Sequence, residues 1–435
     1  MMTNLEGGAA TVVSVETLDN GLRVITEEMP HMRSASVTIW IGAGARYEDP
    51  EINGISHFIE HMLFKGTPKR DSNLKISAAI EGVGGTINGF TNKETTCFLV
   101  KVPSESFGLG LDVLADMVLH SLFDPEAIER ERSVVIEEIK MVRDRPDSWV
   151  HLLLEEMMWP GQPLGRSVAG TEDVIRSITR EKVMDYFESL YQPANVVVSV
   201  AGKVSAEDVR RAVAGEFGSW SGGKRRNFVP ARFASEGPLA EVERRDTKQA
   251  NLAVGLPGYE RLHPRRYALE ILNVILGWGM SSRLFQEVRV KRSLAYSVGS
   301  QYSAYLDTGI MRVYAGVDPA RGADTVNVVL EQLARMRDEK VGDDELRKAK
   351  DFYKGALALR LEDTLNLALR NGEHMVLTGK IVPVHEVLAK VEAVTAQDIA
   401  EVASDLFKKE NLRLAAVGPF EKEDEMAAAL HASVL

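Results

Sequence analysis

The stretch TREKVMDYFESLYQPANVVVSVAG, residues 179 to 202, occurs in the sequence a second time in altered form. Residues 395 to 418 read TAQDIAEVASDLFKKENLRLAAVG. In both copies the first Thr can cap an amphipathic helix, after which a polar loop leads to an apolar strand that ends at Gly. A shift of 216 positions, from 179 to 395, aligns five residue pairs, which indicates a duplicated domain: Thr179 with Thr395, Leu190 with Leu406, Tyr191 with Phe407, Asn195 with Asn411, and Gly202 with Gly418.

The segment between the copies reads as a linker. Residues 218 to 238, GSWSGGKRRNFVPARFASEGP, are rich in Gly, Ser, Arg and Pro and show no sustained hydrophobic period. We therefore predict a first domain over 1–220, a linker over 221–238 and a second domain over 239–435. Two domains also suit the length of 435 residues, which exceeds what one hydrophobic core normally serves.

Each predicted domain opens with apolar, β-rich runs, and helical patterns and further strands follow. Strands in runs with helices between them are typical of an α+β domain with a largely antiparallel sheet. The predicted fold is therefore α+β, with two homologous domains that each pack helices on a mainly antiparallel sheet. The predicted strands are RVITEEM (23–29), SASVTIWIGAGA (34–45), TTCFLVKV (95–102), ANLAVGLPG (250–258) and TGIMRVYAGV (308–317).

Composition and charge narrow the function classes. Hydrophobic residues make up 45% and charged residues 26%, as in soluble globular proteins, and the absence of a long apolar run predicts no membrane span. The net charge of −11 argues against a nucleic-acid partner and suits basic peptides, although solubility alone explains it as well. A single cysteine, Cys97, excludes an internal disulfide and a thiolate metal site. Because the amino terminus shows no leader pattern, we expect a cytoplasmic protein, although a trimmed mature form from another compartment would look the same.

The strongest functional signal lies in GISHFIEHMLFKGT (54–67). We expect a helix there, with Ser56 as its N-cap, on which His57, Glu60 and His61 share one side. Two imidazoles one turn apart can bind one metal ion, and the adjacent Glu can take a proton from a water. A lone surface His is common, but this five-residue pattern arises by accident in a chain of this length only about once in a hundred. The pattern therefore favours a metal site, and its ligand types suit zinc.

A zinc site of this kind needs one more protein ligand. Residues 125 to 144, PEAIERERSVVIEEIKMVRD, predict a helix with many acids. Glu138 has Val or Met at −4, −3, +3 and +4, which places it on an apolar face where a carboxylate needs a cation. Glu137 points about 100° away and is interpreted as solvated. Most other acids of the helix are also interpreted as solvent-facing: Glu126, Glu129 and Glu131.

HFIEHMLFKGT resembles the signature of the pitrilysin-type zinc peptidases, which carry this inverted motif. The size of the chain is similar to that of the mitochondrial processing peptidase branch and its bacterial relatives. In the family a Glu ligand follows the second His by 77 positions, and this count leads from His61 to Glu138. The resemblance implies that His57, His61 and Glu138 bind one Zn2+ per chain and that Glu60 is the general base.

A second stretch resembles the family's substrate-binding edge strand. GGTINGFTNKETT (84–96) matches the strand whose backbone pairs with the peptide. The resemblance implies substrate contacts at Asn88, Gly89, Phe90 and Thr91. The family often has Ala at the position of Gly89, and the glycine here would loosen the strand.

A third stretch lies in the second half. SSRLFQEVRVKRSLAYSV (281–298) resembles the family segment that supplies an Arg and a Tyr seven positions apart, which fall on Arg289 and Tyr296. The resemblance implies that both reach the scissile region of the substrate. Taken without the family, Arg289 fits a basic helix face and Tyr296 fits a half-buried strand aromatic.

The metal motif occurs in the first half alone. The 216-residue shift carries His57, Glu60 and His61 onto the apolar run LEILNVILGWG, which has no such motif. The corresponding positions are Asn273, Leu276 and Gly277. One half is therefore expected to carry the metal and the other to keep the scaffold, an asymmetry that the family shares.

The predicted function is a zinc-dependent endopeptidase that hydrolyses unfolded peptides or presequence-like segments in an enclosed chamber. Because family members enclose substrate between four related domains, the resemblance implies that this chain forms half of a clamshell chamber. It further implies a homodimer, or a heterodimer with a related subunit. Two alternatives are a non-catalytic subunit of the same fold and a peptide-capturing module. Loss of a ligand or of the base would mark the non-catalytic subunit, and the sequence retains all four residues.

Overall fold

The computed structural model describes residues 2–3, 12–223, 227–235, 237, 239–420, 423–432 and 435. Parts of the predicted linker, residues 224–226, 236 and 238, lie outside this set. The chain folds into two compact units, and each unit takes segments from both halves of the sequence. The first unit comprises residues 1–139, 167–229 and 358–387, and the second comprises 140–166, 230–357 and 388–435.

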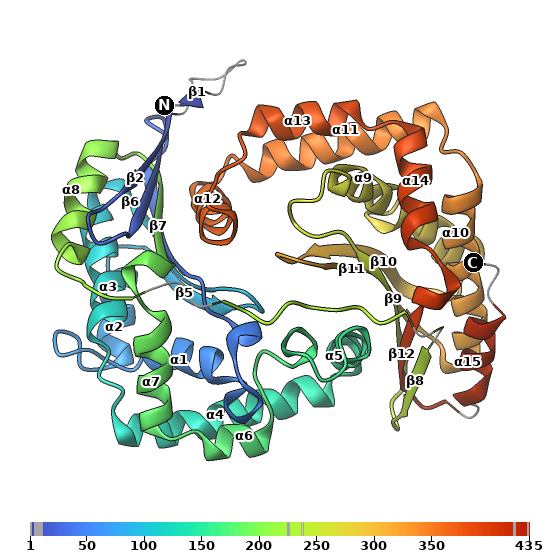
Figure 1. The fold of residues 1–435 in the computed structure, drawn as a ribbon, viewed down its shortest axis with the longest axis horizontal. Helices are drawn as coiled ribbons and strands as arrows, with labels where there is room; N and C mark the ends of the chain where they lie inside the picture. Colours follow the sequence, from blue (N-terminus) through green and yellow to red (C-terminus); the bar gives the residue numbers. More distant parts are fainter. Residues whose placement is uncertain are drawn as a thin grey trace. The chain divides into compact units, whose positions relative to one another are not determined.

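The first unit contains a seven-stranded sheet in the order β1-β2-β3-β7-β4-β6-β5 (Figure 1). Strands β3 and β7 run parallel and the other neighbours run antiparallel, so the predicted mainly antiparallel sheet is confirmed. The strands are β1 (Met2–Thr3), β2 (Val12–Thr17), β3 (Arg23–Glu28), β4 (Ser34–Ile41), β5 (Thr86–Thr91), β6 (Thr96–Pro103) and β7 (Val196–Gly202).

Alternation along β4 explains how both faces of this sheet are covered. Val37 and Ile39 point into the main core, where helices α1, α3, α7 and α8 pack. The helices of this unit are α1 (Ile55–Leu63), α2 (Asn73–Glu81), α3 (Phe107–His120), α6 (Glu172–Ser177), α7 (Arg180–Leu190), α8 (Ala206–Phe217) and α12 (Thr364–Thr378), with most of α4 (Pro125–Asp144).

Helix α12 covers the opposite face of the sheet, although its sequence lies in the second half of the chain. The Ser36 hydroxyl shares a hydrogen bond of 2.9 Å with Thr364, and Thr38 donates to the Ala368 carbonyl at 3.3 Å. The helix approaches Trp40 at Gly372, where a Cβ would lie 2.2 Å from the indole. A glycine is therefore required at this crossing.

The second unit contains a five-stranded sheet in the order β10-β11-β9-β12-β8. Strands β8 and β12 are parallel and the remaining neighbours are antiparallel. The strands are β8 (Leu239–Arg244), β9 (Ala250–Gly258), β10 (Ala295–Ala304), β11 (Gly309–Val317) and β12 (Arg413–Gly418). The helices are α5 (Pro146–Met158), α9 (Arg266–Gly277), α10 (Gly322–Asp338), α14 (Ala396–Leu406) and α15 (Glu423–His431), with most of α11 (Asp343–Arg360) and α13 (Val384–Ala393).

The duplication predicted from the repeated stretch is present in the topology. Strands β8-β12-β9-β11-β10 follow the same order and directions as β3-β7-β4-β6-β5. Thr179 and Thr395 cap α7 and α14, because each hydroxyl accepts a hydrogen bond from the third residue of its helix. Helix α5, from the first half of the chain, packs Leu154 against Gly255 of β9, as α12 packs on β4. The boundaries at 220 and 238 stay a prediction for the duplicated domains, since the compact units are not contiguous in sequence.

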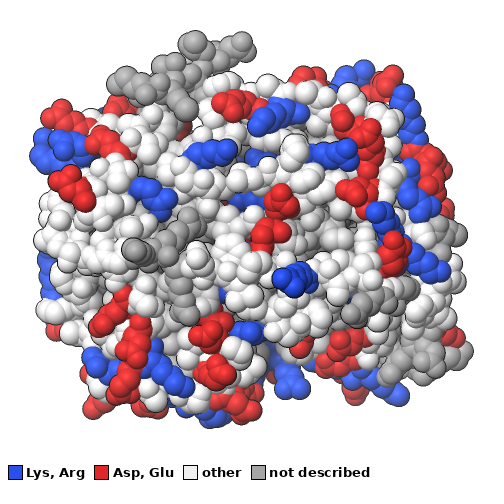
Figure 2. All heavy atoms as spheres, viewed as in Figure 1, with Lys and Arg blue, Asp and Glu red and all other residues white. Residues whose placement is uncertain are grey.

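On the face drawn in Figure 2, Lys and Arg side chains intermingle with Asp and Glu.

Among the described residues, no single helix is long and apolar enough to cross a bilayer. The pair over Ser104–His120 and Pro125–Asp144 passes that test together by length and composition, with a bend of 102°.

Candidate metal centre

Helix α1, which carries the H-x-x-E-H motif, begins at a glycine and a buried carboxylate. The N-cap is Gly54, with φ 99° in the left-handed region, so the prediction that Ser56 caps this helix is wrong. Glu48 instead accepts hydrogen bonds from the Gly54 N–H at 2.7 Å, the Ser56 N–H at 2.8 Å and the Asn53 amide at 2.8 Å. A carboxylate at the start of a helix accepts hydrogen bonds from N–H groups that have no partner within the helix, and its negative charge interacts favourably with the helix dipole. Burial raises the pKa of Glu48 above its usual value.

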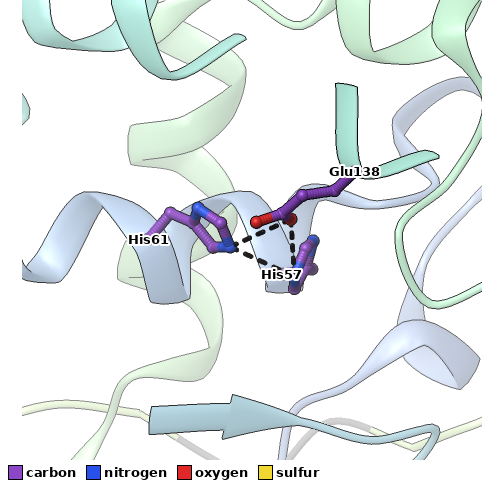
Figure 3. A group of neighbouring side chains, drawn as sticks. All are labelled: His57, His61 and Glu138. Atoms are coloured by element: carbon purple, nitrogen blue, oxygen red, sulfur yellow. Dashed lines mark hydrogen bonds and ion pairs between the residues drawn. The ribbon is translucent and has the colours of Figure 1, made fainter. Parts of the chain in front are cut away.

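Three side chains converge over this helix (Figure 3). His57 Nε2 lies 3.2 Å from His61 Nε2, and Glu138 Oε2 from α4 lies 3.7 Å and 3.5 Å from these two nitrogens. This group, all of it in the first unit, is the one set of metal-type ligands found among the described residues. The structure thus brings together the three ligands that the sequence predicts.

The spacing of the three atoms fits a zinc ion. Zinc bonds of 2.0–2.1 Å in a tetrahedron place neighbouring ligand atoms about 3.3 Å apart, close to the separations between these atoms. Burial lowers the pKa of His57 to about 4, which keeps the imidazole neutral as a ligand must be. The other ring nitrogen of His57, Nδ1, is buried without a hydrogen-bond partner in the described part of the chain.

Glu131 completes the centre, and the prediction that it faces solvent is wrong. Its side chain is 6% exposed, and Oε1 lies 2.7 Å from His61 Nδ1 while Oε2 lies 2.6 Å from Lys65 Nζ. Although burial opposes it, these two bonds lower the pKa of Glu131, so that it is an ionised acceptor. Glu131 therefore favours the tautomer of His61 with its proton on Nδ1, the tautomer that leaves Nε2 to bind a metal ion.

A sequence signal for Glu131 does exist. It precedes Glu138 by seven residues, which is two helical turns, so both carboxylates lie on the same side of α4. Helix α4 itself was predicted with its observed ends, and Glu137 is exposed as predicted. Two of the apolar neighbours used for the prediction, Val134 and Met141, are exposed in the structure.

Glu60 lies beside the ligands and faces strand β5. It is 8% exposed, and its Oε2 accepts a hydrogen bond of 2.7 Å from the Thr91 hydroxyl. Burial raises the pKa of Glu60, and the hydrogen bond from Thr91 opposes that shift. A buried carboxylate next to three metal-type ligands can accept and release a proton.

Strand β5 is the terminal strand of its sheet, in agreement with the predicted edge strand. Gly89 and Thr91 point towards α1, while Phe90 lies on the opposite face with its ring 5.6 Å from that of Trp40. Asn88 is exposed, and its side chain accepts a hydrogen bond from the Gly89 N–H. Among the described residues no strand pairs with the outer side of β5, and an extended peptide can add to such an edge.

Arg289 and Tyr296 belong to the second unit. Arg289 lies on a π-helix, η6 (Phe285–Lys291), and Tyr296 lies where the register between β10 and β11 shifts. Tyr296 is 46% exposed, and both residues line a hollow of about 580 Å³ together with Lys248 and Asp318. Arg289 and Tyr296 therefore line one hollow of the second unit.

Among the residues of the second half that the structure describes, there is no counterpart of the metal group. Asn273, Leu276 and Gly277 lie in α9 and are buried. The Asn273 side-chain oxygen accepts a hydrogen bond from the Ser300 hydroxyl at 2.7 Å. Asn273, onto which the 216-residue shift carries His57, thus serves the packing of α9 on β10.

Comparisons with known proteins agree with this asymmetry. Residues 23–172 match the model of insulinase (peptidase family M16), and residues 177–353 match that of the peptidase M16 inactive domain. The uncharacterized zinc protease YmxG of Bacillus subtilis is 39% identical over 404 residues, 93% of this chain and 97% of the relative. An uncharacterized zinc protease of Streptomyces coelicolor is 39% identical over 435 residues, 99% of this chain and 94% of the relative.

Solved structures share the fold at lower identity. A protease from Helicobacter pylori superposes with a TM-score of 0.89 at 22% identity, covering 94% of this chain and 100% of the other. A structure described as a peptidase M16 inactive domain from Pseudomonas fluorescens gives 0.87 at 18% identity, covering 94% and 98%. At these identities the similarities show a shared fold and nothing about activity.

Proposed function

The chain belongs to the insulinase family of peptidases, family M16, and on that premise we propose that it is a zinc-dependent endopeptidase of unfolded peptides. The observation that supports the proposal most directly is the meeting of His57, His61 and Glu138, whose ligand atoms lie within 4.8 Å of one another. Glu60, the residue needed for proton transfer, lies on helix α1 with the two histidines.

In this proposal His57, His61 and Glu138 hold the metal. A zinc ion supplies Lewis-acid chemistry to a scissile carbonyl and to water. Glu60 accepts a proton at its carboxylate and delivers it to the leaving amine. Glu131 keeps the His61 ring in the orientation and tautomer that ligation requires, through the bond to Nδ1.

The substrate is proposed to be an extended peptide or presequence-like segment. The edge strand β5 presents backbone groups at Asn88 to Thr91, and pairing with them requires a chain without secondary structure of its own. Arg289 and Tyr296 contact the scissile region in this proposal, with the Tyr296 phenol donating to the developing oxyanion. The exposure of Tyr296 and the hollow that it lines support a contact with substrate.

The proposed assembly is a homodimer that encloses the peptide, with a heterodimer containing a related subunit as the second form. The proposal follows from the two M16 matches along this chain, over residues 23–172 and 177–353, since the resemblance implies a chamber built from four related domains.

The second candidate is a non-catalytic or peptide-capturing subunit, which the inactive-domain match favours for the second half. The first half argues against it, because the three ligands and the base are all present and adjacent. The two candidates differ in one measurable respect, which is peptide-bond cleavage.

The test incubates the zinc form with an unfolded fluorogenic peptide, with and without a chelator. We expect cleavage that the chelator abolishes and that added zinc restores. Glu60→Gln should bind zinc and the peptide yet not cleave, since the amide cannot accept the proton. Cleavage by Glu60→Gln at the wild-type rate would refute the mechanism, and peptide binding without cleavage by the wild type would favour the capturing subunit.

A further inference from the structure

The carboxylate of Glu60 is held from the side of the edge strand. Thr91 Oγ1 donates to Glu60 Oε2 at 2.7 Å, and in the described part of the chain no other side chain hydrogen-bonds this carboxylate. The terminal torsion of a glutamate is broad, so an unrestrained carboxylate would rotate between orientations. The hydroxyl assigns one oxygen to Thr91 and leaves Oε1 free.

Gly89 bounds the same carboxylate two residues earlier on the same face of β5. A Cβ at Gly89 would lie 3.3 Å from both Cγ and Oε1 of Glu60, and 3.1 Å from the Phe64 ring. The glycine therefore lets the strand backbone approach the base closely. Glu60 is confined between the bare backbone at Gly89 and the hydroxyl of Thr91.

The register of β5 fixes where that hydroxyl points. Thr91 is paired with Thr96 of β6, and Phe90 packs on the other face with its ring 5.6 Å from that of Trp40. A slip of one residue would turn Thr91 to the opposite face, because side chains alternate along a strand. The strand that presents backbone to a peptide thus also carries the group that orients the base.

We propose that Thr91 is a positioning residue, whose hydroxyl orients the Glu60 carboxylate so that Oε1 is the oxygen that takes the proton. This proposal rests on the proposed peptidase function. It assigns the Thr91 side chain to the base, whereas the family resemblance implied a contact with substrate. The Thr91 backbone remains available for pairing with a peptide.

The experiment compares Thr91→Val, which has nearly the same shape without the hydroxyl, with Thr91→Ser, which keeps the hydroxyl. Thr325→Val is the matched control, because it removes a buried hydroxyl that bonds the Arg321 carbonyl in the second unit. For each protein we would measure bound zinc, kcat and KM on an unfolded fluorogenic peptide, and the melting temperature. If Thr91→Val does not fold, Thr91→Ala replaces it in the comparison with Thr91→Ser.

We expect Thr91→Val to keep one zinc per chain and a KM within twofold of wild type, while kcat falls about 10- to 100-fold, as for a misplaced catalytic group. Thr91→Ser should restore kcat to within about threefold of wild type. A kcat for Thr91→Val equal to that of Thr325→Val, or an equal loss in Thr91→Ser, would overturn the proposal while leaving the peptidase function intact. Failure of the wild type itself to cleave would instead refute the proposed function.

Discussion

Glu138 is the third member of the candidate metal group, and it comes from a helix far from the motif in sequence. The side chain is 37% exposed and touches the two imidazoles through one oxygen, Oε2. Removing it leaves two nitrogen ligands, too few for a stable zinc site. The adjacent Glu137 is exposed and provides a matched control.

We therefore predict that Glu138→Ala and His57→Ala lose zinc on dialysis, whereas Glu137→Ala keeps one zinc per chain. Metal analysis after gel filtration measures this directly. Full occupancy in Glu138→Ala would show that another group is the third ligand.

Glu131 allows a separate prediction, because it contacts His61 and not the metal position. Loss of such a partner typically weakens metal affinity 10- to 100-fold. We expect Glu131→Gln to bind zinc about 10- to 100-fold more weakly in competition with a chelating dye. Glu129→Gln, on the exposed side of the same helix, should match wild type. Equal affinities in both variants would contradict the assigned role.

The different outcomes for these two acids have a physical reason. The sequence of α4 shows which residues have apolar neighbours on the same helix, and this pattern favours Glu138. The partners of Glu131 are His61 and Lys65, which lie on another helix and its following turn. Neighbours along one helix do not reveal a buried ion pair with a second helix, so Glu131 was assigned to solvent.

At the scale of elements, the cap of α1 determines how firmly the motif is held. Glu48 bonds two backbone N–H groups and the Asn53 amide at the start of the helix. Removing a cap costs about 1–2 kcal/mol, and here it also leaves buried donors unpaired.

We predict that Glu48→Ala speeds hydrogen–deuterium exchange of the α1 amides about tenfold or more. The variant should also lose zinc more readily. Glu51→Ala, an exposed acid in the preceding turn, is the control. Unchanged exchange in α1 would mean that packing alone maintains the start of this helix.

Local elements were largely predictable from sequence patterns. The run ANLAVGLPG is β9 over its full length, because apolar residues bounded by turn signals mark a buried strand. The sequence patterns did not predict that α5, from the first half of the chain, packs on the second sheet, or that α12, from the second half, packs on the first. Thr364 and Ser36, which bond each other, are 328 residues apart, and an amphipathic helix does not reveal which sheet it will cover.

At the scale of the whole molecule, the proposed chamber requires a second copy of this chain or a related subunit. We predict a mass of twice 48.0 kDa by light scattering at working concentration. The dimer should persist in Glu60→Gln, since that change does not alter the fold. A monomer with full peptidase activity would contradict the enclosed dimer.

The exchange of segments also determines what happens if the polypeptide is severed. Each compact unit contains chain from both sides of the linker, so a cut after the exposed Arg232 would leave every sheet with its covering helix. The two fragments should elute together from a native sizing column and separate only in denaturant. Limited proteolysis of this segment should therefore not inactivate the protein, because the two fragments stay associated through the units that they share.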